Sequence, residues 1–168
     1  MQFYIQILSG THYRESMYRK MSPKTVSILF VNDDLEDRCL ISEAFNNDKD
    51  KIQLYKTVNS GDLLSYLKGK NKYTDRDNFP LPSLILLDLG ESWIYNRDVL
   101  ADIKKDPELR RIPIIVLTKS QDEDNFQEND DLGITGFIKK PMTIDGLVDV
   151  MKTLDNYLFQ AMILPTRY

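Results

Sequence analysis

Five short segments typical of strands, four of which are apolar runs that end abruptly in polar residues, are the feature of this sequence that most limits its possible folds. The third run, 83–87, follows Pro82 and leads directly into the acid Asp88, two residues before Gly90. A short continuous apolar run with such boundaries is typical of a strand that is buried on both faces of a parallel sheet. The pattern predicts strands at 26–31, 52–58, 83–88, 112–118 and 135–139.

Between these runs, apolar residues recur at the three- and four-residue intervals of helices that bury one face. The clearest stripe lies near the C-terminus, at Leu147, Met151 and Leu154, and a weaker one runs from Leu35 through Cys39. Because strands and helices alternate, we expect right-handed crossovers and an α/β fold with helices on both faces of the sheet. The predicted helices span 35–46, 61–68, 96–104, 122–131 and 143–158.

Polar side chains end four of the five runs. Asn32 and Asp33 follow the first run, Asp88 the third, Thr118 the fourth and Lys140 the fifth. The C-terminal ends of parallel strands meet at one edge, where open α/β sheets bind their ligands. Two carboxylates suit Mg²⁺, and a hydroxyl and a lysine can contact phosphoryl oxygens. The pattern predicts a phosphoryl-transfer site with Asp88 as the candidate nucleophile, which would carry the group as an acyl phosphate.

Composition and charge argue against several other classes of function. The net charge is −4, and the first 24 residues carry four basic side chains against one acid, so the remainder is more acidic still. A chain without a basic stripe lacks the usual basis for nucleic-acid binding. The single cysteine, Cys39, excludes an intrachain disulfide. No apolar run approaches the roughly 20 residues of a membrane span, so we expect a cytoplasmic protein that binds neither nucleic acid nor membrane.

The length of 168 residues fits one domain with a tail at each end. Residues 1–24 show no sustained periodicity and are predicted to form an N-terminal extension, within which Met21 is a second candidate start of translation. The domain is predicted to span 25–158, followed by a C-terminal tail at 159–168. The apolar stretch 157–164 makes a homodimer through the last helix the expected assembly.

Four motifs in order resemble the receiver domain of two-component response regulators, the CheY-like family. The interval of 30 residues from Asp88 to Thr118, followed by 22 to Lys140, fits the spacing of that family. The resemblance covers about 26–155 and implies a flavodoxin-like, doubly wound sheet of five parallel strands in the order 2-1-3-4-5. The motifs are VNDD at 31–34, LILLDL at 84–89, IPIIVLT at 112–118 and GFIKKP at 136–141.

The resemblance implies the functional roles of several residues. Asp88 would accept a phosphoryl group from a sensor histidine kinase, and Thr118 and Lys140 would contact that group. Phe137 occupies the position of the aromatic switch residue, and the peptide between Lys140 and Pro141 is expected to be cis. Such a protein catalyses only its own phosphorylation and dephosphorylation, so it is a signalling module in a phosphorelay and not a metabolic enzyme.

The same resemblance implies a Mg²⁺ site. Its protein ligands would be Asp33, Asp88 and the backbone carbonyl of Gly90. Asn32 stands where the family usually carries an acid, and its amide is a candidate to hold a metal-bound water. The turn after Asp88 also departs from the family pattern. These departures leave open a degenerate receiver, which docks partner proteins independently of phosphorylation.

Two other functions fit the motifs less well. A haloacid-dehalogenase-type phosphatase needs a second acid two residues after its nucleophile, where this chain has Gly90. A flavin-binding protein of the same topology needs a phosphate-cradling loop after the first strand, where this chain is acidic.

A subtype is suggested by segments outside the four motifs. The long loop with Tyr73 and Phe79, the stretch 103–120 and the tail 154–165 are similar to small stand-alone regulators. Those regulators partner bacterial phytochrome-type histidine kinases. A phytochrome-type kinase is therefore the expected partner.

Overall fold

The computed structural model describes residues 26–45, 52–88, 97–118 and 133–163, with side chains of the last helix described as far as Leu154. All neighbouring strands of its single five-stranded sheet pair in parallel, in the order β2-β1-β3-β4-β5. The predicted topology is confirmed. The strands are β1 Val26–Asn32, β2 Ile52–Thr57, β3 Leu84–Asp88, β4 Ile114–Thr118 and β5 Gly136–Lys139.

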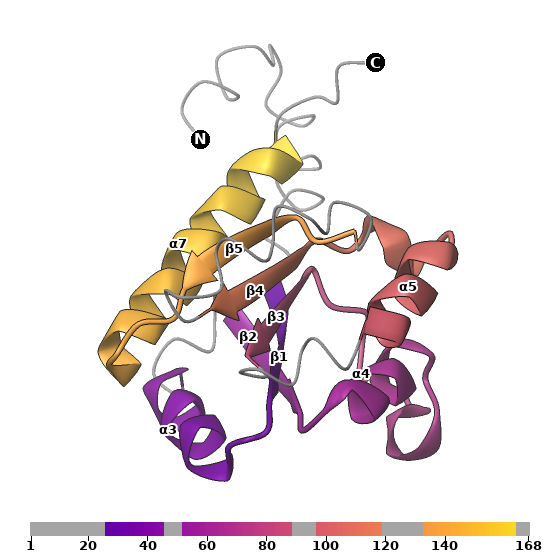
Figure 1. Ribbon diagram of the computed structural model, residues 1–168, viewed down its shortest axis with the longest axis horizontal. Coiled ribbons are helices and arrows are strands. Elements are labelled where there is room, and N and C mark those ends of the chain that lie inside the picture. Colours follow the sequence, from indigo (N-terminus) through magenta and orange to yellow (C-terminus); the bar gives the residue numbers. More distant parts are fainter. Residues whose placement is uncertain (1–25, 46–51, 89–96, 119–132, 164–168) are drawn as a thin grey trace, which may run out of the picture.

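Helices cover both faces of the sheet, with α3 and α7 on one side and α4 and α5 on the other (Figure 1). None of the described helices is both long enough and apolar enough to span a membrane. The predicted helix at 122–131 lies outside the described residues. The helices are α3 Leu35–Phe45, α4 Ser60–Leu67, α5 Arg97–Lys105 and α7 Ile144–Ile163, with short 3₁₀ turns η1 Asn71–Tyr73 and η3 Leu109–Arg111.

Two hydrophobic cores explain why the central strands β1, β3 and β4 are almost entirely apolar. Successive side chains of a strand point to opposite faces, and here both faces are covered. Leu29 and Ile85 pack into the core beneath α4 and α5, whereas Phe30 and Leu86 pack into the core beneath α3 and α7. Every residue of β1 is buried. The central strands therefore end in polar residues only where the sheet itself ends.

The buried face of α3 differs from the prediction. Leu35 is 68% exposed and Cys39 is exposed as well, so neither lies on the apolar face that the weak stripe suggested. Ile41 is the fully buried residue of this helix, in the core shared with α7. Residues four apart share a helix face, so the position one turn before Ile41 is Asp37, which is half-buried. The inward face of α3 therefore begins with an acid.

The long polar loop before β3 contains an aromatic cluster. The rings of Tyr66 and Tyr73 lie 4.9 Å apart, and Phe79 packs edge-on against Tyr73 at 5.1 Å. The Arg76 guanidinium donates to the backbone carbonyls of Tyr66, Leu67 and Phe79. The contacts with Tyr66 and Leu67 satisfy carbonyls in the last turn of α4. The contact with Phe79 ties the loop to the same guanidinium before the chain enters β3.

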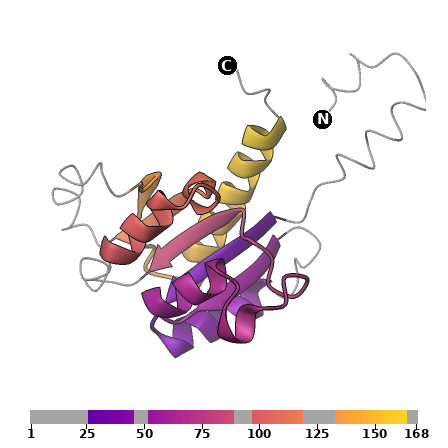
Figure 2. The same ribbon diagram turned by 90° about the vertical axis from the view of Figure 1, so that its right-hand side faces the viewer.

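The last helix begins as predicted and ends later. The Thr143 hydroxyl accepts from the backbone N–H of Gly146 at 3.1 Å, which caps the N-terminus of the helix. The helix then continues past the predicted end at 158 to Ile163. Figure 2 shows its C-terminal turns extending beyond the strands of the sheet.

Candidate functional site

Three polar residues are buried side by side where β1, β3 and β4 end. Asn32 pairs with Asp88 in the register of the sheet, and Thr118 pairs with Lys139. The exposed fractions of Asn32, Asp88 and Thr118 are 1%, 3% and 4%. Polar groups this deeply buried are stable only with partners, and their partners define the site.

Two nitrogen donors hold the Asp88 carboxylate. Its Oδ2 accepts from Asn32 Nδ2 at 2.7 Å and from Lys140 Nζ at 2.9 Å. Within the described residues, both contacts of Asp88 use this one oxygen. Asp88 is therefore a buried carboxylate that is oriented from one side by an amide and an ammonium group.

The orientation of the Asn32 amide follows from its second contact. Its Oδ1 accepts from the backbone N–H of Asp34, and a backbone N–H can only donate. The Nδ2 group must therefore face Asp88. An acid at this position could not donate a hydrogen bond and would repel Asp88, so the departure from the family pattern exchanges a repulsion for a hydrogen bond. The predicted role of Asn32 in holding a metal-bound water stays a prediction.

Lys140 enters the site from the end of β5. Its backbone N–H donates to the Thr118 carbonyl at 2.7 Å, which fixes the start of its side chain. The following peptide bond to Pro141 is trans, so the expected cis bond is wrong. The trans form is the intrinsically favoured one, and in it Lys140 Nζ already reaches Asp88. The preceding residue, Lys139, is exposed.

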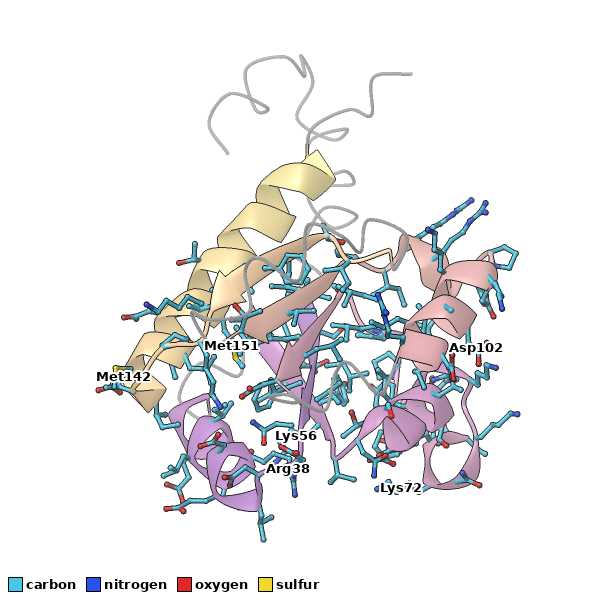
Figure 3. The ribbon with its side chains drawn as sticks, viewed as in Figure 1. Arg38, Lys56, Lys72, Asp102, Met142 and Met151 are labelled. Atoms are coloured by element: carbon cyan, nitrogen blue, oxygen red, sulfur yellow. The ribbon has the colours of Figure 1, made fainter. Side chains whose placement is uncertain are left out.

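Asp37 was missed by the sequence analysis and belongs to the site. Its Oδ2 lies 3.3 Å from Lys140 Nζ and 3.5 Å from Asn32 Nδ2. Its neighbour Arg38 donates from the guanidinium to the backbone carbonyl of Asn32, and Figure 3 shows this side chain on α3. The available signal in the sequence was the four-residue interval from Asp37 to Ile41, which is the helical interval of the buried face.

The environment shifts the pKa of both charged partners. Burial raises the pKa of the Asp88 carboxyl above its ordinary 3.8, although the Lys140 ammonium and the Asn32 hydrogen bond oppose this rise. The Coulomb repulsion of Asp37 adds to it. For Lys140, burial lowers the pKa, but the hydrogen bond and charge of Asp88 and the charge of Asp37 outweigh it and leave the pKa raised. Lys140 therefore stays protonated beside a carboxyl that binds a proton more readily than usual.

The raised pKa of Asp88 predicts the direction in which its contribution to stability changes with pH. Between the ordinary value and the raised one, the folded state binds more protons than the unfolded state, so this group's contribution to the free energy of unfolding falls as the pH rises through that window. A ¹³C NMR titration of the Asp88 carboxyl without divalent ions should give a midpoint above 3.8. A midpoint at or below that value would contradict the burial argument.

The other predicted site residues are placed as follows. Asp33 directly follows β1 and is exposed, which leaves its carboxylate accessible from solvent. Phe137 lies on β5 opposite Val116, with 38% of its surface exposed. Gly90, and with it the turn that contains Trp93, lies outside the described residues.

The donor set fits a hard divalent cation. Asp33 and Asp88 are carboxylates at the ends of neighbouring elements, and the described contacts of Asp88 leave its Oδ1 for a ligand. Carboxylate oxygens are the ligands that Mg²⁺ takes in proteins, usually one or two together with waters and phosphate oxygens. Within the described ranges no cluster of three or more acidic, histidine or cysteine side chains could hold a metal. A site of two carboxylates is consistent with this finding, since Asn32 is not an acid.

No family model matches the chain. Comparisons with curated sequences and with solved structures both find response regulators. The curated response regulator Rcp1 of Synechocystis sp. is 30% identical over 138 residues, which cover 82% of this chain and 92% of Rcp1. The crystal structure of the phosphorylated cyanobacterial phytochrome response regulator RcpA is 31% identical, with a TM-score of 0.65, and covers 84% of this chain and 99% of that chain. The crystal structure of the Mn²⁺-bound form of Rcp1 is 27% identical, with a TM-score of 0.60. This match also covers 84% of this chain and 99% of that chain.

Proposed function

The chain belongs to the receiver family of two-component response regulators, and on this basis we propose that Asp88 is the residue that receives the phosphoryl group. Its role in a phosphorelay follows from its relatives. The observation that supports Asp88 is its position: a nearly fully buried carboxylate at the end of the central strand β3, hydrogen-bonded by Asn32 and Lys140.

The transfer itself requires little covalent chemistry from the protein. An oxygen of the Asp88 carboxylate attacks the phosphorus of a phosphohistidine. The phosphorus–nitrogen bond breaks, its electron pair stays on the imidazole, and an acyl phosphate forms on Asp88. Catalysis consists of positioning and charge neutralisation. Lys140 supplies one positive charge, and the Thr118 hydroxyl supplies a donor for a phosphoryl oxygen.

A divalent ion would supply the remaining positive charge. The relative Rcp1 has a Mn²⁺-bound form, and we assign the ion here as Mg²⁺, which suits the same hard oxygen ligands. Asp33, Asp88 and the backbone carbonyl of Gly90 would hold it. Bound there, the ion would neutralise charge on the transferring group and on the carboxylates, which otherwise repel a phosphoryl donor.

Signal output would use the neighbouring strands. After phosphorylation, Thr118 would move toward the phosphoryl group, and the space that it leaves would admit the partly exposed ring of Phe137 on β5. This movement would change the surface formed by β5 and α7. The only chemistry in this scheme is phosphorylation and dephosphorylation of the protein's own Asp88.

A relative supports the proposed kinase partner, and the last helix supports the proposed homodimer. RcpA is a phytochrome response regulator, so the proposed phosphoryl donor is a phytochrome-type sensor histidine kinase. The C-terminal turns of α7 extend beyond the sheet (Figure 2), which supports the expected homodimer through this helix. The degenerate receiver is the less supported alternative, because Asn32 hydrogen-bonds Asp88 and leaves the Lys140 contact intact.

The experiment that tests this function uses a small phosphoryl donor. The full chain, incubated with acetyl phosphate and Mg²⁺, should gain the mass of one phosphoryl group and lose it again on incubation in acid or hydroxylamine, as an acyl phosphate does. Intact-protein mass spectrometry measures both steps. Omitting Mg²⁺ and adding a chelator should prevent the gain. A wild-type protein that acquires no phosphoryl group from acetyl phosphate or from a phytochrome-type kinase would favour the docking module.

A further inference from the structure

The described site contains a second carboxylate that no motif marks. Asp37 Oδ2 lies 3.3 Å from Lys140 Nζ and 3.5 Å from Asn32 Nδ2. The same two nitrogens lie 2.9 and 2.7 Å from Asp88 Oδ2. The ammonium and the amide therefore lie between two carboxylate oxygens, one from a strand and one from a helix.

The fold fixes the position of Asp37 from several directions. Asp34 Oδ1 accepts from the backbone N–H groups of Glu36 and Asp37, which caps the start of α3. One turn later, Ile41 is anchored in the core against α7. A negative charge in the first turn of a helix is also favoured by the helix dipole. The Asp37 side chain is therefore held at the strand ends by helix geometry.

The Lys140 side chain needs such a partner. A lysine side chain is flexible, with a point charge at the end of a four-carbon stem, and holding it in one rotamer has an entropic cost. Two carboxylates within 3.3 Å of the ammonium restrict it more than one does. Asn32 is neutral, so within the described residues Asp37 is the acid that shares Lys140 with Asp88.

We infer that Asp37 is a positioning residue of the phosphorylation site, which holds the Lys140 ammonium against Asp88 before transfer. The inference rests on the proposed function of Asp88 and adds a residue to that site. Asp37 acts through Lys140 and touches neither the phosphoryl donor nor the reacting oxygen. Without its charge, Lys140 keeps one anionic partner, and its ammonium samples more positions.

The test compares three single variants of the full chain. Asp37→Asn removes the charge and keeps the shape, Asp37→Glu keeps the charge, and Glu36→Gln removes a charge from an exposed neighbour in the same helical turn. The initial rate of phosphorylation by acetyl phosphate with Mg²⁺ should fall roughly tenfold in Asp37→Asn, the size expected when one nearby charge is lost. It should stay within about twofold of wild type in Glu36→Gln and recover largely in Asp37→Glu.

A second readout reports on Lys140 directly. The ¹H–¹⁵N signal of its ammonium group, identified by its loss in Lys140→Met, should be observable in wild type because the paired protons exchange slowly with water. It should broaden or vanish in Asp37→Asn and persist in Glu36→Gln. A merely structural role of Asp37 would change the unfolding temperature without this selective loss.

The outcomes separate the two claims. If Asp37→Asn matches Glu36→Gln in phosphorylation rate and in the Lys140 signal, or is phosphorylated as fast as wild type, the inference is wrong even though Asp88 accepts the phosphoryl group. If wild type gains no phosphoryl group at all, the proposed function fails. The NMR measurement still decides whether Asp37 holds Lys140, because it requires no phosphoryl transfer.

Discussion

Asp88→Asn is expected to abolish phosphorylation, with the initial rate from acetyl phosphate reduced by roughly a thousandfold or more. An amide oxygen is a far weaker nucleophile than a carboxylate, and an asparagine cannot form a stable acyl phosphate. Within the described residues, both donors of the site lie closer to the Asp88 carboxylate, at 2.7 and 2.9 Å, than to any other. Intact-protein mass spectrometry in the presence of Mg²⁺ measures the result.

The variant should fold, so that the loss can be assigned to chemistry. The asparagine side chain has nearly the same shape, and its oxygen can still accept from Asn32. Lys140 also keeps its contact with Asp37 at 3.3 Å. The matched control is Asp149→Asn, which makes the same chemical change at an exposed position of α7 and should leave the rate unchanged. Undiminished labelling of Asp88→Asn would move the phosphorylation site to another residue.

Lys140→Met is expected to lower the phosphorylation rate roughly 100-fold, because it removes a fixed positive charge from a buried site. Lys140 Nζ lies 2.9 Å from Asp88 Oδ2 and is the described cation in contact with it. Methionine keeps the length and apolar character of the stem, and the backbone N–H of residue 140 still donates to the Thr118 carbonyl. The variant therefore removes the ammonium charge and its hydrogen bonds and keeps the rest of the side chain in place.

The same variant has a second consequence that can be measured independently. The hydrogen bond and charge of Lys140 lower the pKa of Asp88 against the effect of burial. Without them, the midpoint of the Asp88 titration should rise further above that of wild type. Lys139→Met is the matched control, since Lys139 is an exposed neighbour on β5. Equal phosphorylation rates in the two variants would show that Lys140 has no role in transfer.

The strand ends could be predicted from the sequence because strands buried on both faces are almost entirely apolar. Where such a run stops, the sheet stops, and the residue that stops it lies at the edge. This reasoning placed Asn32, Asp88, Thr118 and Lys140 at one edge of a parallel sheet, whereas the order of the strands, which the structure confirms, was implied by the resemblance to receivers. The spacing of the same residues carried the resemblance to receivers.

The face of α3 could not be predicted in the same way. A weak apolar stripe pointed to Leu35 and Cys39, yet both are exposed in the folded chain. The rotation of a short helix about its axis is set by the residues that pack against its neighbours, and here that residue is Ile41 in the core with α7. The same rotation turns Asp37 inward.

The sequence by itself determined which segments form the central strands and which polar residues end them, because a strand buried on both faces leaves its signature in consecutive residues. Only the tertiary structure decided which acid shares the Lys140 ammonium with Asp88. Asp37 and Lys140 are separated by 103 positions, and the contact between them exists because two distant elements pack at one edge of the sheet. Contacts of that kind depend on packing geometry, which local sequence patterns do not contain.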